Sequence, residues 1–345
     1  MTNKASGSRR RTSKVTRRGF LSAAAGAGAV MAVPVSAQAQ PAQIGKPLKE
    51  ITIGEISRSG TGWARVIAAG KGYFAEEGLT VDSLIIQGGP PGIVRQVVGG
   101  SLDIGVSNFD IIIRGIQGGG PITMIGSSMI KFALSVVSAP GIKNAADLKG
   151  KTVSVSSPKD PTALFLNRWL RQNGMSPSDV DVIYVAATQD RFAALLSGTV
   201  AAVALTQPFD FRALDRGFNR LIDYGQMAGD NYGFLAFTVR KQWLQSNPET
   251  ARGFLRALKR GSDWLHEPAN KEEAISLLAG DIKQDKALVA RMYDYYLLEL
   301  KPYSRTLAIQ PSHVQGVLDA MVETKELTAP TPAVEQYVDL SYLPK

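Results

Sequence analysis

The order of strand-like and helix-like segments between residues 50 and 110 returns about a hundred residues later in the chain. Short apolar runs of strand length alternate in both units with stretches that carry apolar residues at helical spacing. The spacing is also preserved, because Ser57 and Gln87 lie 30 residues apart and Ser157 and Gln189 lie 32 apart. This alternation predicts an α/β fold with right-handed crossovers and one mostly parallel sheet in each unit, flanked by helices.

The pattern also predicts where the individual elements lie. The helix after Asp160 has the clearest start, because an aspartate before Pro161 is a typical N-cap followed by proline at the first helical position. Apolar stripes predict later helices whose apolar residues form core. The expected strands are 50–56, 79–86, 102–106, 152–155, 180–185, 200–205 and 234–239, and the later helices are 242–265, 271–279, 285–296 and 312–325.

Short polar turns follow the first six of these strands. Ligands of parallel α/β folds bind outside the carboxyl ends of the strands. Hydroxyls, carboxamides and free backbone N–H groups are suited to a small polar molecule. We therefore predict a small-molecule site between two sets of three turns. The predicted ligand-binding residues are Ser57, Arg58, Ser59, Thr61, Gln87, Gly88, Ser107, Asn108, Phe109, Ser156, Ser157, Gln189, Thr206, Gln207 and Phe209.

Several of these residues have a second interpretation that the sequence leaves open. Arg58 is suited to a bidentate contact with an anionic ligand, and equally to a solvated position at the rim. Phe109 and Phe209 occupy matched positions in the two units, where they either sandwich a ligand or pack in the core. Asp160, as an N-cap, would occupy the helix N-terminus at which an anion could otherwise bind.

The formal net charge of +9 originates in the first 39 residues. Seven of the 39 lysines and arginines lie there and none of the 30 acidic residues does, so the remainder has 32 basic against 30 acidic residues. The pair Arg17-Arg18 precedes Gly-Phe-Leu, a weakly apolar stretch and the small-residue site Ala37-Gln38-Ala39. This order is typical of a twin-arginine export signal. We predict removal of residues 1–39 on export to the periplasm, and no nucleic-acid partner.

Composition excludes several kinds of chemistry. The chain has no cysteine, which excludes disulfides, thiolate metal ligands, cysteine nucleophiles and a lipid-modified cysteine anchor. With only His266 and His313, a histidine-built metal centre or a Ser–His triad is not expected. No P-loop or Gly-x-Gly-x-x-Gly pattern occurs, and no run in the mature chain approaches 18 apolar residues. We therefore expect no catalytic residues, no metal, no cofactor and no membrane-embedded segment.

Several strings in the chain resemble the periplasmic substrate-binding proteins of the nitrate/sulfonate/taurine ABC importers, within the NMT1/THI5-like superfamily. Residues 71–79, KGYFAEEGL, are similar to that family's KGYF-x-x-EGL, and residues 98–105, VGGSLDIG, to its V-x-x-G-x-x-D-x-G. Residues 146–151, ADLKGK, are similar to the string before the first strand of the second lobe. Matches run from about residue 51 to 278, which is most of the mature chain.

The resemblance implies a two-lobe, type II periplasmic-binding-protein fold with two hinge crossings. Lobe 1 would comprise residues 48–137 and 236–345, and lobe 2 residues 138–235, with crossings near 135–139 and 234–239. It implies a monomeric component of an ABC importer that captures a small organic anion, a sulfonate or carboxylate, by lobe closure. An inner-membrane permease with its ATPase subunit would receive the ligand. Nitrate, an aromatic acid and a pyrimidine stay open as ligands.

Two other classes share this architecture. An enzyme of the thiamine-pyrimidine-synthase-like superfamily is the main alternative, although those enzymes depend on a histidine donor and a cysteine-rich motif that this chain lacks. Hydroxymethylbilane synthase anchors its cofactor on a cysteine, which is also absent. The effector domain of a transcription regulator needs a helix-turn-helix ahead of it, which residues 1–47 do not supply.

Overall fold

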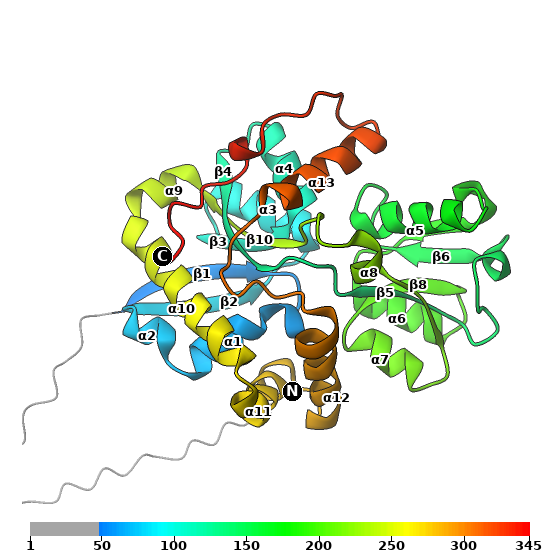
Figure 1. Ribbon diagram of the computed structural model, residues 1–345, viewed down its shortest axis with the longest axis horizontal. Helices are drawn as coiled ribbons and strands as arrows, with labels where there is room; N and C mark the ends of the chain where they lie inside the picture. Colours follow the sequence, from blue (N-terminus) through cyan, green and yellow to red (C-terminus); the bar gives the residue numbers. More distant parts are fainter. Residues whose placement is uncertain (1–47) are drawn as a thin grey trace, which may run out of the picture. The chain divides into compact units, whose positions relative to one another are not determined.

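The computed structural model describes residues 48–345, so the predicted export signal, 1–39, lies outside the described residues. Two five-stranded sheets are formed, and helices pack against both (Figure 1). The strands are β1 (Lys49–Glu55), β2 (Leu79–Ile85), β3 (Ile104–Asn108), β4 (Ile122–Met129), β5 (Leu134–Ser138), β6 (Thr152–Val155), β7 (Asp181–Tyr184), β8 (Ala202–Thr206), β9 (Asn219–Asp223) and β10 (Leu235–Arg240).

The two sheets have the same internal order. Sheet A is ordered β2-β1-β3-β10-β4 and sheet B is ordered β7-β6-β8-β5-β9. Within each sheet the first three strands are parallel, and the fourth, β10 or β5, runs antiparallel to both of its neighbours. The predicted α/β class with mostly parallel sheets is confirmed. We call sheet A with its helices lobe 1, and sheet B with its helices lobe 2.

The helices between strands follow the predicted alternation. In lobe 1, α10 packs against α1, α2 and β2, whereas α3 and α4 contact β3, β4 and β10 (Figure 1). In lobe 2, α6 and α7 pack against β8. The bounds are α1 (Trp63–Gly70), α2 (Tyr73–Glu76), α3 (Gly89–Gly99), α4 (Phe109–Gln117), α5 (Pro161–Gln172), α6 (Thr188–Leu196), α7 (Phe209–Leu214) and α8 (Tyr224–Ala228).

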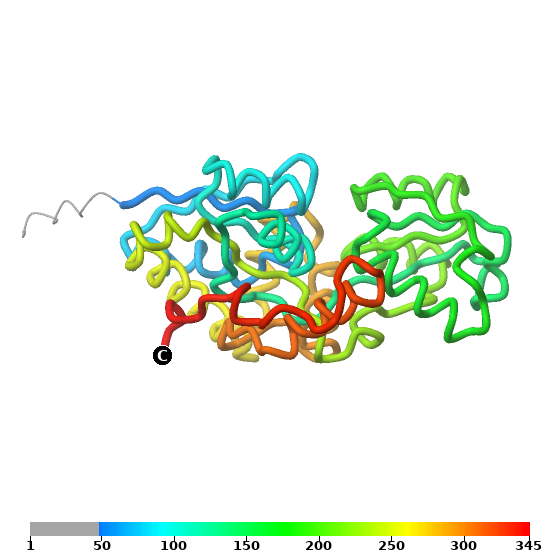
Figure 2. Tube along the Cα trace, turned by 90° about the horizontal axis from the view of Figure 1, so that it is seen from above, coloured from blue at the N-terminus to red at the C-terminus, as the bar shows by residue number. Residues whose placement is uncertain are grey.

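After β10 the chain forms the helices α9 (Lys241–Ser246), α10 (Pro248–His266), α11 (Lys271–Ile282), α12 (Lys286–Tyr293) and α13 (Pro311–Glu323). The end of the chain then returns to sheet A, where Val338 forms a bridge to Met124 of β4 (Figure 2). No helix between residues 48 and 345 has the length and apolar character needed to cross a bilayer.

Two predicted helices differ from those found. The helix predicted over 242–265 is interrupted at Asn247, because the residue before a proline is disfavoured in the α conformation and Pro248 follows it. The helix predicted over 285–296 ends at Tyr293 and continues as a π-helical segment, η5 (Asp294–Leu300). Both breaks depend on local geometry that an apolar stripe does not report.

The first hinge crossing lies earlier than predicted. β4 belongs to sheet A and β5 to sheet B, so the chain passes between lobes over residues 130–133 and not near 135–139. The predicted boundary between 137 and 138 is therefore wrong, because β5 already pairs with β8 and β9. Neither β4 nor β5 is among the expected strands, and no glycine or proline marks residues 130–133 as a crossing. The return crossing occupies residues 229–234, after α8, which packs on β5, β9 and α5 of lobe 2, and it lies next to the predicted position.

Aromatic side chains pack the two crossings together. Phe132, in the first crossing, lies 5.3 Å from Tyr232 and 4.3 Å from Phe234, ring centroid to ring centroid, and both of these belong to the second. Phe165 of α5 contacts Phe132 at 5.4 Å and Tyr224 at 5.6 Å. All five side chains are buried. The crossings therefore share one apolar cluster with lobe 2, and its packing fixes their paths.

The packing of Phe132 gives a first testable prediction. Phe132→Ala removes a buried ring with three aromatic neighbours, so the free energy of unfolding should fall by about 3–5 kcal/mol. Leu298→Ala, at a side chain with 60% exposure, is the control and should change it by less than about 0.5 kcal/mol. Urea denaturation followed by circular dichroism measures both. An equal, small effect of the two variants would show that the cluster does not stabilise the crossings.

Candidate functional site

The parallel strands bring the predicted turns together in two groups. β1, β2 and β3 end at Glu55, Ile85 and Asn108, and parallel strands of one sheet end at the same edge. The turns that contain Ser57–Thr61, Gln87–Gly88 and Asn108 therefore lie at one edge of sheet A. In the same way, the turns after β6, β7 and β8 lie at one edge of sheet B.

The turn after β1 is a chain of hydroxyl groups. Ser57 Oγ donates to Ser59 Oγ at 3.2 Å, and Ser59 Oγ lies 3.0 Å from Thr61 Oγ1. Ser59 is buried and also caps the short 3-10 helix η1 (Gly60–Gly62). The three side chains therefore fix the backbone of this turn while Ser57 and Thr61 stay half-buried.

Arg58 is bound to lobe 1 by contacts within that lobe. Its Nη2 donates to the carbonyl of Ser83 at 2.8 Å, and its Nη1 lies 3.3 Å from Oδ1 of Asp281. Asp281 also accepts from Arg65, which pairs with Glu55 at 3.1 Å. The charge of Arg58 is therefore already opposed by a carboxylate, and this leaves less of it for an anionic ligand.

The other predicted residues of lobe 1 differ in exposure. Gln87 and Gly88 are exposed, and Gly88 adopts a left-handed backbone with φ of 83° before α3. Asn108 is half-buried, precedes α4 and forms no side-chain cap. Ser107 and Phe109 are fully buried, and Ser107 donates to the carbonyl of Pro90 at 3.1 Å. The exposed and half-buried groups alone are placed to meet a solute.

In lobe 2, the start of α5 is occupied by the chain itself. Asp160 Oδ1 accepts from the backbone N–H of Thr162 at 2.9 Å and of Ala163 at 3.4 Å, as the sequence predicts for an N-cap. Ser156 donates to Asp160 and lies 3.0 Å from Thr162 Oγ1. Ser157 is half-buried and Gln189, in the first turn of α6, is exposed. The N-terminus of α5 is therefore not open to an anionic ligand.

The two phenylalanines at matched positions are not equivalent. Phe109 is core, and an added Cβ on Gly233 would lie 2.5 Å from its ring. Phe209 is half-buried, with its ring 5.4 Å from that of Phe192 and the guanidinium of Arg212 5.8 Å away. A sandwich of a ligand between them does not fit this arrangement, because the Phe109 ring is already fully packed.

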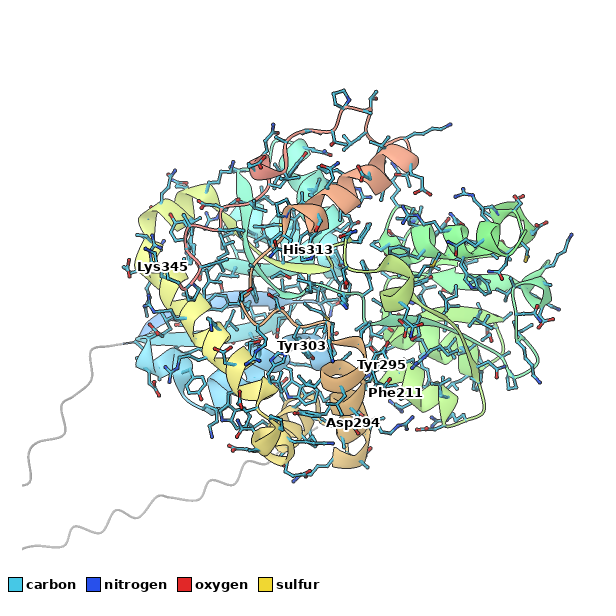
Figure 3. All side chains as sticks on the ribbon, viewed as in Figure 1. Phe211, Asp294, Tyr295, Tyr303, His313 and Lys345 are labelled. Atoms are coloured by element: carbon cyan, nitrogen blue, oxygen red, sulfur yellow. The ribbon has the colours of Figure 1, made fainter. Side chains whose placement is uncertain are left out.

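Gln207 also differs from the expectation, because it joins the two lobes. Its Nε2 donates to Asp210 at 2.8 Å, and its Oε1 accepts from the hydroxyl of Tyr296 in η5 at 2.9 Å. Tyr295, the neighbour of Tyr296, donates to Asp223 at 2.8 Å and packs against Phe211 of α7 (Figure 3). Thr206 stays half-buried. Gln207 is completely buried and both atoms of its amide are hydrogen-bonded within the protein, so it is not placed to meet a ligand.

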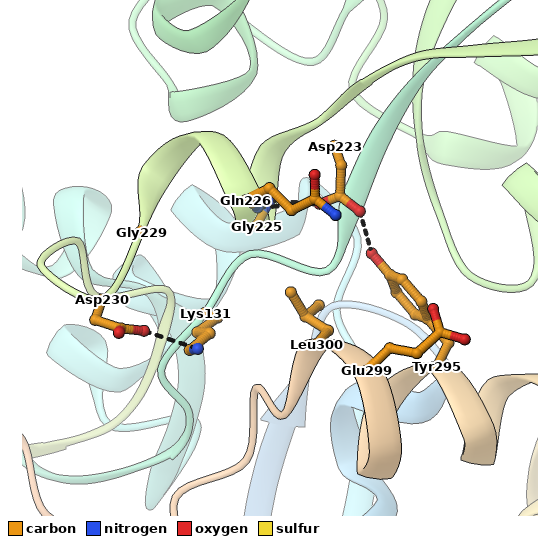
Figure 4. Close-up of a pocket in the computed structure, with 9 residues that line it drawn as sticks. All are labelled: Lys131, Asp223, Gly225, Gln226, Gly229, Asp230, Tyr295, Glu299 and Leu300. Carbon is orange, nitrogen blue, oxygen red and sulfur yellow. Dashed lines mark hydrogen bonds and ion pairs between the residues drawn. The ribbon is translucent and has the colours of Figure 1, made fainter.

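A hollow of about 290 Å³ lies beside the crossings and is lined in part by Asp223, at the end of β9 (Figure 4). It contains the Tyr295–Asp223 hydrogen bond and an ion pair of 2.7 Å between Lys131 and Asp230. None of the predicted ligand-binding residues lines it. Among residues 48–345, no group of three or more metal-ligating side chains is arranged to bind a metal ion.

A buried carboxyl follows β3. Asp110 forms an ion pair with Arg114, which also pairs with Glu326 at 2.8 Å, and burial raises the pKa of Asp110 to about 6 although the charge of Arg114 opposes this. Asp210 is its counterpart after β8, and burial raises the pKa of Asp210 as well, against Arg220. The Phe-Asp strings of the two units therefore place a buried carboxyl after β3 and another after β8. The raised pKa of each cannot be read from the sequence pattern.

Arg191 is a buried residue that is not among the predicted ligand-binding residues. It lies in the first turn of α6 with 3% exposure, and its guanidinium donates to the backbone carbonyls of Val185 and Ala186, after β7, and of Ala204, within β8. An arginine in a Gln-Asp-Arg string at a helix start resembles an ordinary solvated residue. Its position before the buried Phe192 was the available signal.

The titration of Asp110 gives a second prediction. Between pH 4 and pH 6 the folded protein retains a proton that the unfolded chain has lost, so this group lowers the stability as pH rises through that window. Relative to Asp110→Asn, the wild type should lose on the order of 2–3 kcal/mol of unfolding free energy between pH 4 and pH 7. Urea denaturation at a series of pH values measures it. Asp319→Asn, an exposed carboxyl, is the control; a curve for Asp110→Asn parallel to the wild type would contradict the assignment.

A protein-family sequence model described as NMT1/THI5 like matches residues 64–271. Among curated proteins, one of Brucella abortus strain 2308 named as a binding protein is 28% identical over 224 residues, which are 64% of this chain and 68% of that protein. The nitrate/nitrite binding protein NrtA of Synechococcus elongatus is 28% identical over 152 residues, 41% of this chain and 33% of NrtA.

Solved structures show the same fold at low identity. The alkanesulfonate-binding protein SsuA of Xanthomonas axonopodis pv. citri superposes with a TM-score of 0.67 at 18% identity, over 85% of this chain and 99% of SsuA. The nitrate-binding protein NrtA of Synechocystis PCC 6803 gives 0.70 at 18%, over 86% and 87%. The desulfurization enzyme DSZB gives 0.65 at 14%, over 85% and 97%, so the fold occurs in binding proteins and in an enzyme.

Proposed function

Since this chain belongs to the NMT1/THI5-like family, we propose that it is the extracytoplasmic solute-binding component of an ABC importer. Its ligand is a small organic anion, a sulfonate or a carboxylate, aromatic acids included. The protein acts as a monomer in the periplasm, after export by the twin-arginine route, and delivers its ligand to an inner-membrane permease with an ATPase subunit. It performs no covalent chemistry.

The observation that carries this proposal is the matched pair of strand-end edges. Each sheet presents three polar turns at its carboxyl edge, and the two sheets are joined by two crossings. The exposed or half-buried groups in these turns include Ser57, Thr61, Gln87, Asn108 and Ser157. Such groups suit a small polar solute, and the names of the sulfonate-binding and nitrate-binding relatives support an anion.

Capture is proposed to occur by closure of the lobes. A ligand that contacts both sets of turns stabilises the closed form relative to the open one, and the two crossings absorb the rotation. Micromolar affinity corresponds to about −8 kcal/mol, which a few charge-assisted hydrogen bonds and a buried apolar body supply. The permease then recognises the closed form.

The ligand class is tested by a thermal-shift screen of sulfonates, nitrate, carboxylates and pyrimidines. At a hundred times its dissociation constant, a ligand should add about 2.7 kcal/mol and raise the melting temperature by several degrees. We expect at least one small organic acid to do so. If only neutral or cationic compounds shift the melting curve, the organic-anion assignment is wrong, and turnover of a bound compound would establish the enzyme alternative instead.

The same screen tests the site when it is repeated on variants. Asn108→Ala and Ser157→Ala should each weaken binding of the acid that stabilises the wild type about tenfold, because each removes a hydrogen bond to a charged group. Ser197→Ala, at the far end of α6, is the matched control and should bind like the wild type. Unchanged affinity in both site variants would place the ligand elsewhere.

The export route has its own test. Replacement of Arg17 and Arg18 by lysine keeps the charge but removes the arginine pair. We expect the variant to accumulate unprocessed in the cytoplasm, whereas Arg10→Lys with Arg11→Lys, in the same basic stretch, is exported. Immunoblots of periplasmic and cytoplasmic fractions measure both. Normal periplasmic accumulation of the Arg17/Arg18 variant would exclude the twin-arginine route.

A further inference from the structure

Arg191 is a buried cation without a carboxylate partner. It has 3% exposure and forms no ion pair with any of residues 48–345. Its Nε donates to the carbonyl of Ala204 at 2.7 Å, and its Nη1 donates to those of Val185 at 2.6 Å and Ala186 at 2.8 Å. Within the described part of the chain, Nη2 has no hydrogen-bond partner. Carbonyl dipoles reduce the cost of burying the charge but do not neutralise it.

The guanidinium lies at the carboxyl edge of sheet B. Val185 and Ala186 follow β7, and Ala204 belongs to β8. In the sheet, β6 lies between these two strands, so Arg191 spans the carboxyl end of β6. The turn of Ser156 and Ser157 begins at that end. The buried charge is therefore located where a ligand of an α/β sheet binds.

The start of α6 has the unused donors that the start of α5 lacks. Asp160 caps α5, whereas Ala187 precedes α6 and offers no side-chain cap. The Thr188 hydroxyl oxygen is buried and has no hydrogen-bond partner among the described residues. The one carboxylate in the first turn of α6, Asp190, is exposed. At the start of α6, Nη2 of Arg191, the Thr188 hydroxyl and the first N–H groups of this nine-residue helix are donors that lack partners among the described residues.

Arg191 remains charged at neutral pH. Burial lowers its pKa to about 10, and the charge of Asp160 is the largest of the influences that act to raise it. A guanidinium at low dielectric interacts strongly with an anion that enters its surroundings, because water screens neither charge.

We propose that Arg191, Thr188 and the first turn of α6 form an oxyanion subsite in lobe 2, which binds the sulfonate or carboxylate group of the ligand. This inference rests on the proposed function for the identity of that ligand. In this proposal the negative charge of the ligand is recognised in lobe 2 by Arg191, whose other donors already bind backbone carbonyls. Arg58 in lobe 1 is instead paired with Asp281.

Selenate tests the subsite directly, because it is a tetrahedral oxyanion whose selenium is located by anomalous scattering. Crystals of the full chain are soaked in sodium selenate. We expect an anomalous peak within hydrogen-bond distance of Arg191 Nη2 and the N–H groups that begin α6. No peak there at a concentration that gives peaks elsewhere would overturn the proposal, and a peak that persists unchanged in Thr188→Val and Arg191→Gln would mark an adventitious ion only.

Titration calorimetry with selenate gives the second measurement. Arg191→Gln should weaken binding at least tenfold and Thr188→Val about fivefold to tenfold. Arg216→Gln, after the end of α7, and Thr199→Val, after the end of α6, are matched controls for charge and hydroxyl. Because Arg191 also binds three backbone carbonyls, Thr188→Val decides the question if Arg191→Gln does not fold. Equal affinity of Thr188→Val and Thr199→Val would then refute the subsite.

Failure of the proposed function and failure of the subsite give different results in these experiments. If no organic acid stabilises the wild type but selenate binds at Arg191, the proposed ligand class is wrong and the oxyanion subsite stands. If an organic acid binds and the Arg191 and Thr188 variants retain its affinity within twofold, the proposed function stands and the subsite is wrong.

Discussion

The architecture depends on an exchange of strands between the two halves of the chain. β10, which follows the second crossing, is inserted antiparallel between β3 and β4, and β5, which follows the first, is inserted between β8 and β9. Neither sheet is continuous without a strand that has come directly from the other lobe. Any rotation between the lobes is therefore confined to residues 130–133 and 229–234, and the aromatic cluster around Phe132 lies at that point.

Much of the fold can be predicted from the sequence, because parallel strands with both faces buried are continuous apolar runs between turn residues. β6 has the predicted bounds, and the Asp160-Pro161 pair marks the start of α5. The position of the first crossing cannot be predicted, because nothing in the sequence around Phe132 signals a change of sheet. The spacing of apolar residues indicates which residues are buried and whether they form a helix or a strand. It carries no information on which sheet a strand enters.

The candidate site is predicted less completely for a related reason. Ser, Thr, Asn and Gln at a strand end have the same pattern whether they face solvent or a neighbouring element. Asn108 and Gln207 occupy corresponding positions, yet Asn108 has no side-chain cap and Gln207 is bonded to Tyr296, which comes from 89 residues further along the chain. Arg191 shows the reverse case, in which a residue with a solvated pattern is buried by long-range contacts with carbonyls of two strands.

The π-helical segment has a consequence for the length of the C-terminal region. Tyr296 contacts lobe 2 through Gln207 and lies against Gly60 of lobe 1, where an added Cβ would be 2.3 Å from its ring. A residue inserted or deleted in the last turn of α12 would rotate the two tyrosines by about 100° about the helix axis, because an α-helix has 3.6 residues per turn. Tyr295 and Tyr296 would then no longer reach Asp223 and Gln207 together. Related chains that preserve this inter-lobe connection must therefore preserve the number of residues between α12 and its tyrosines, even where the side chains around them change.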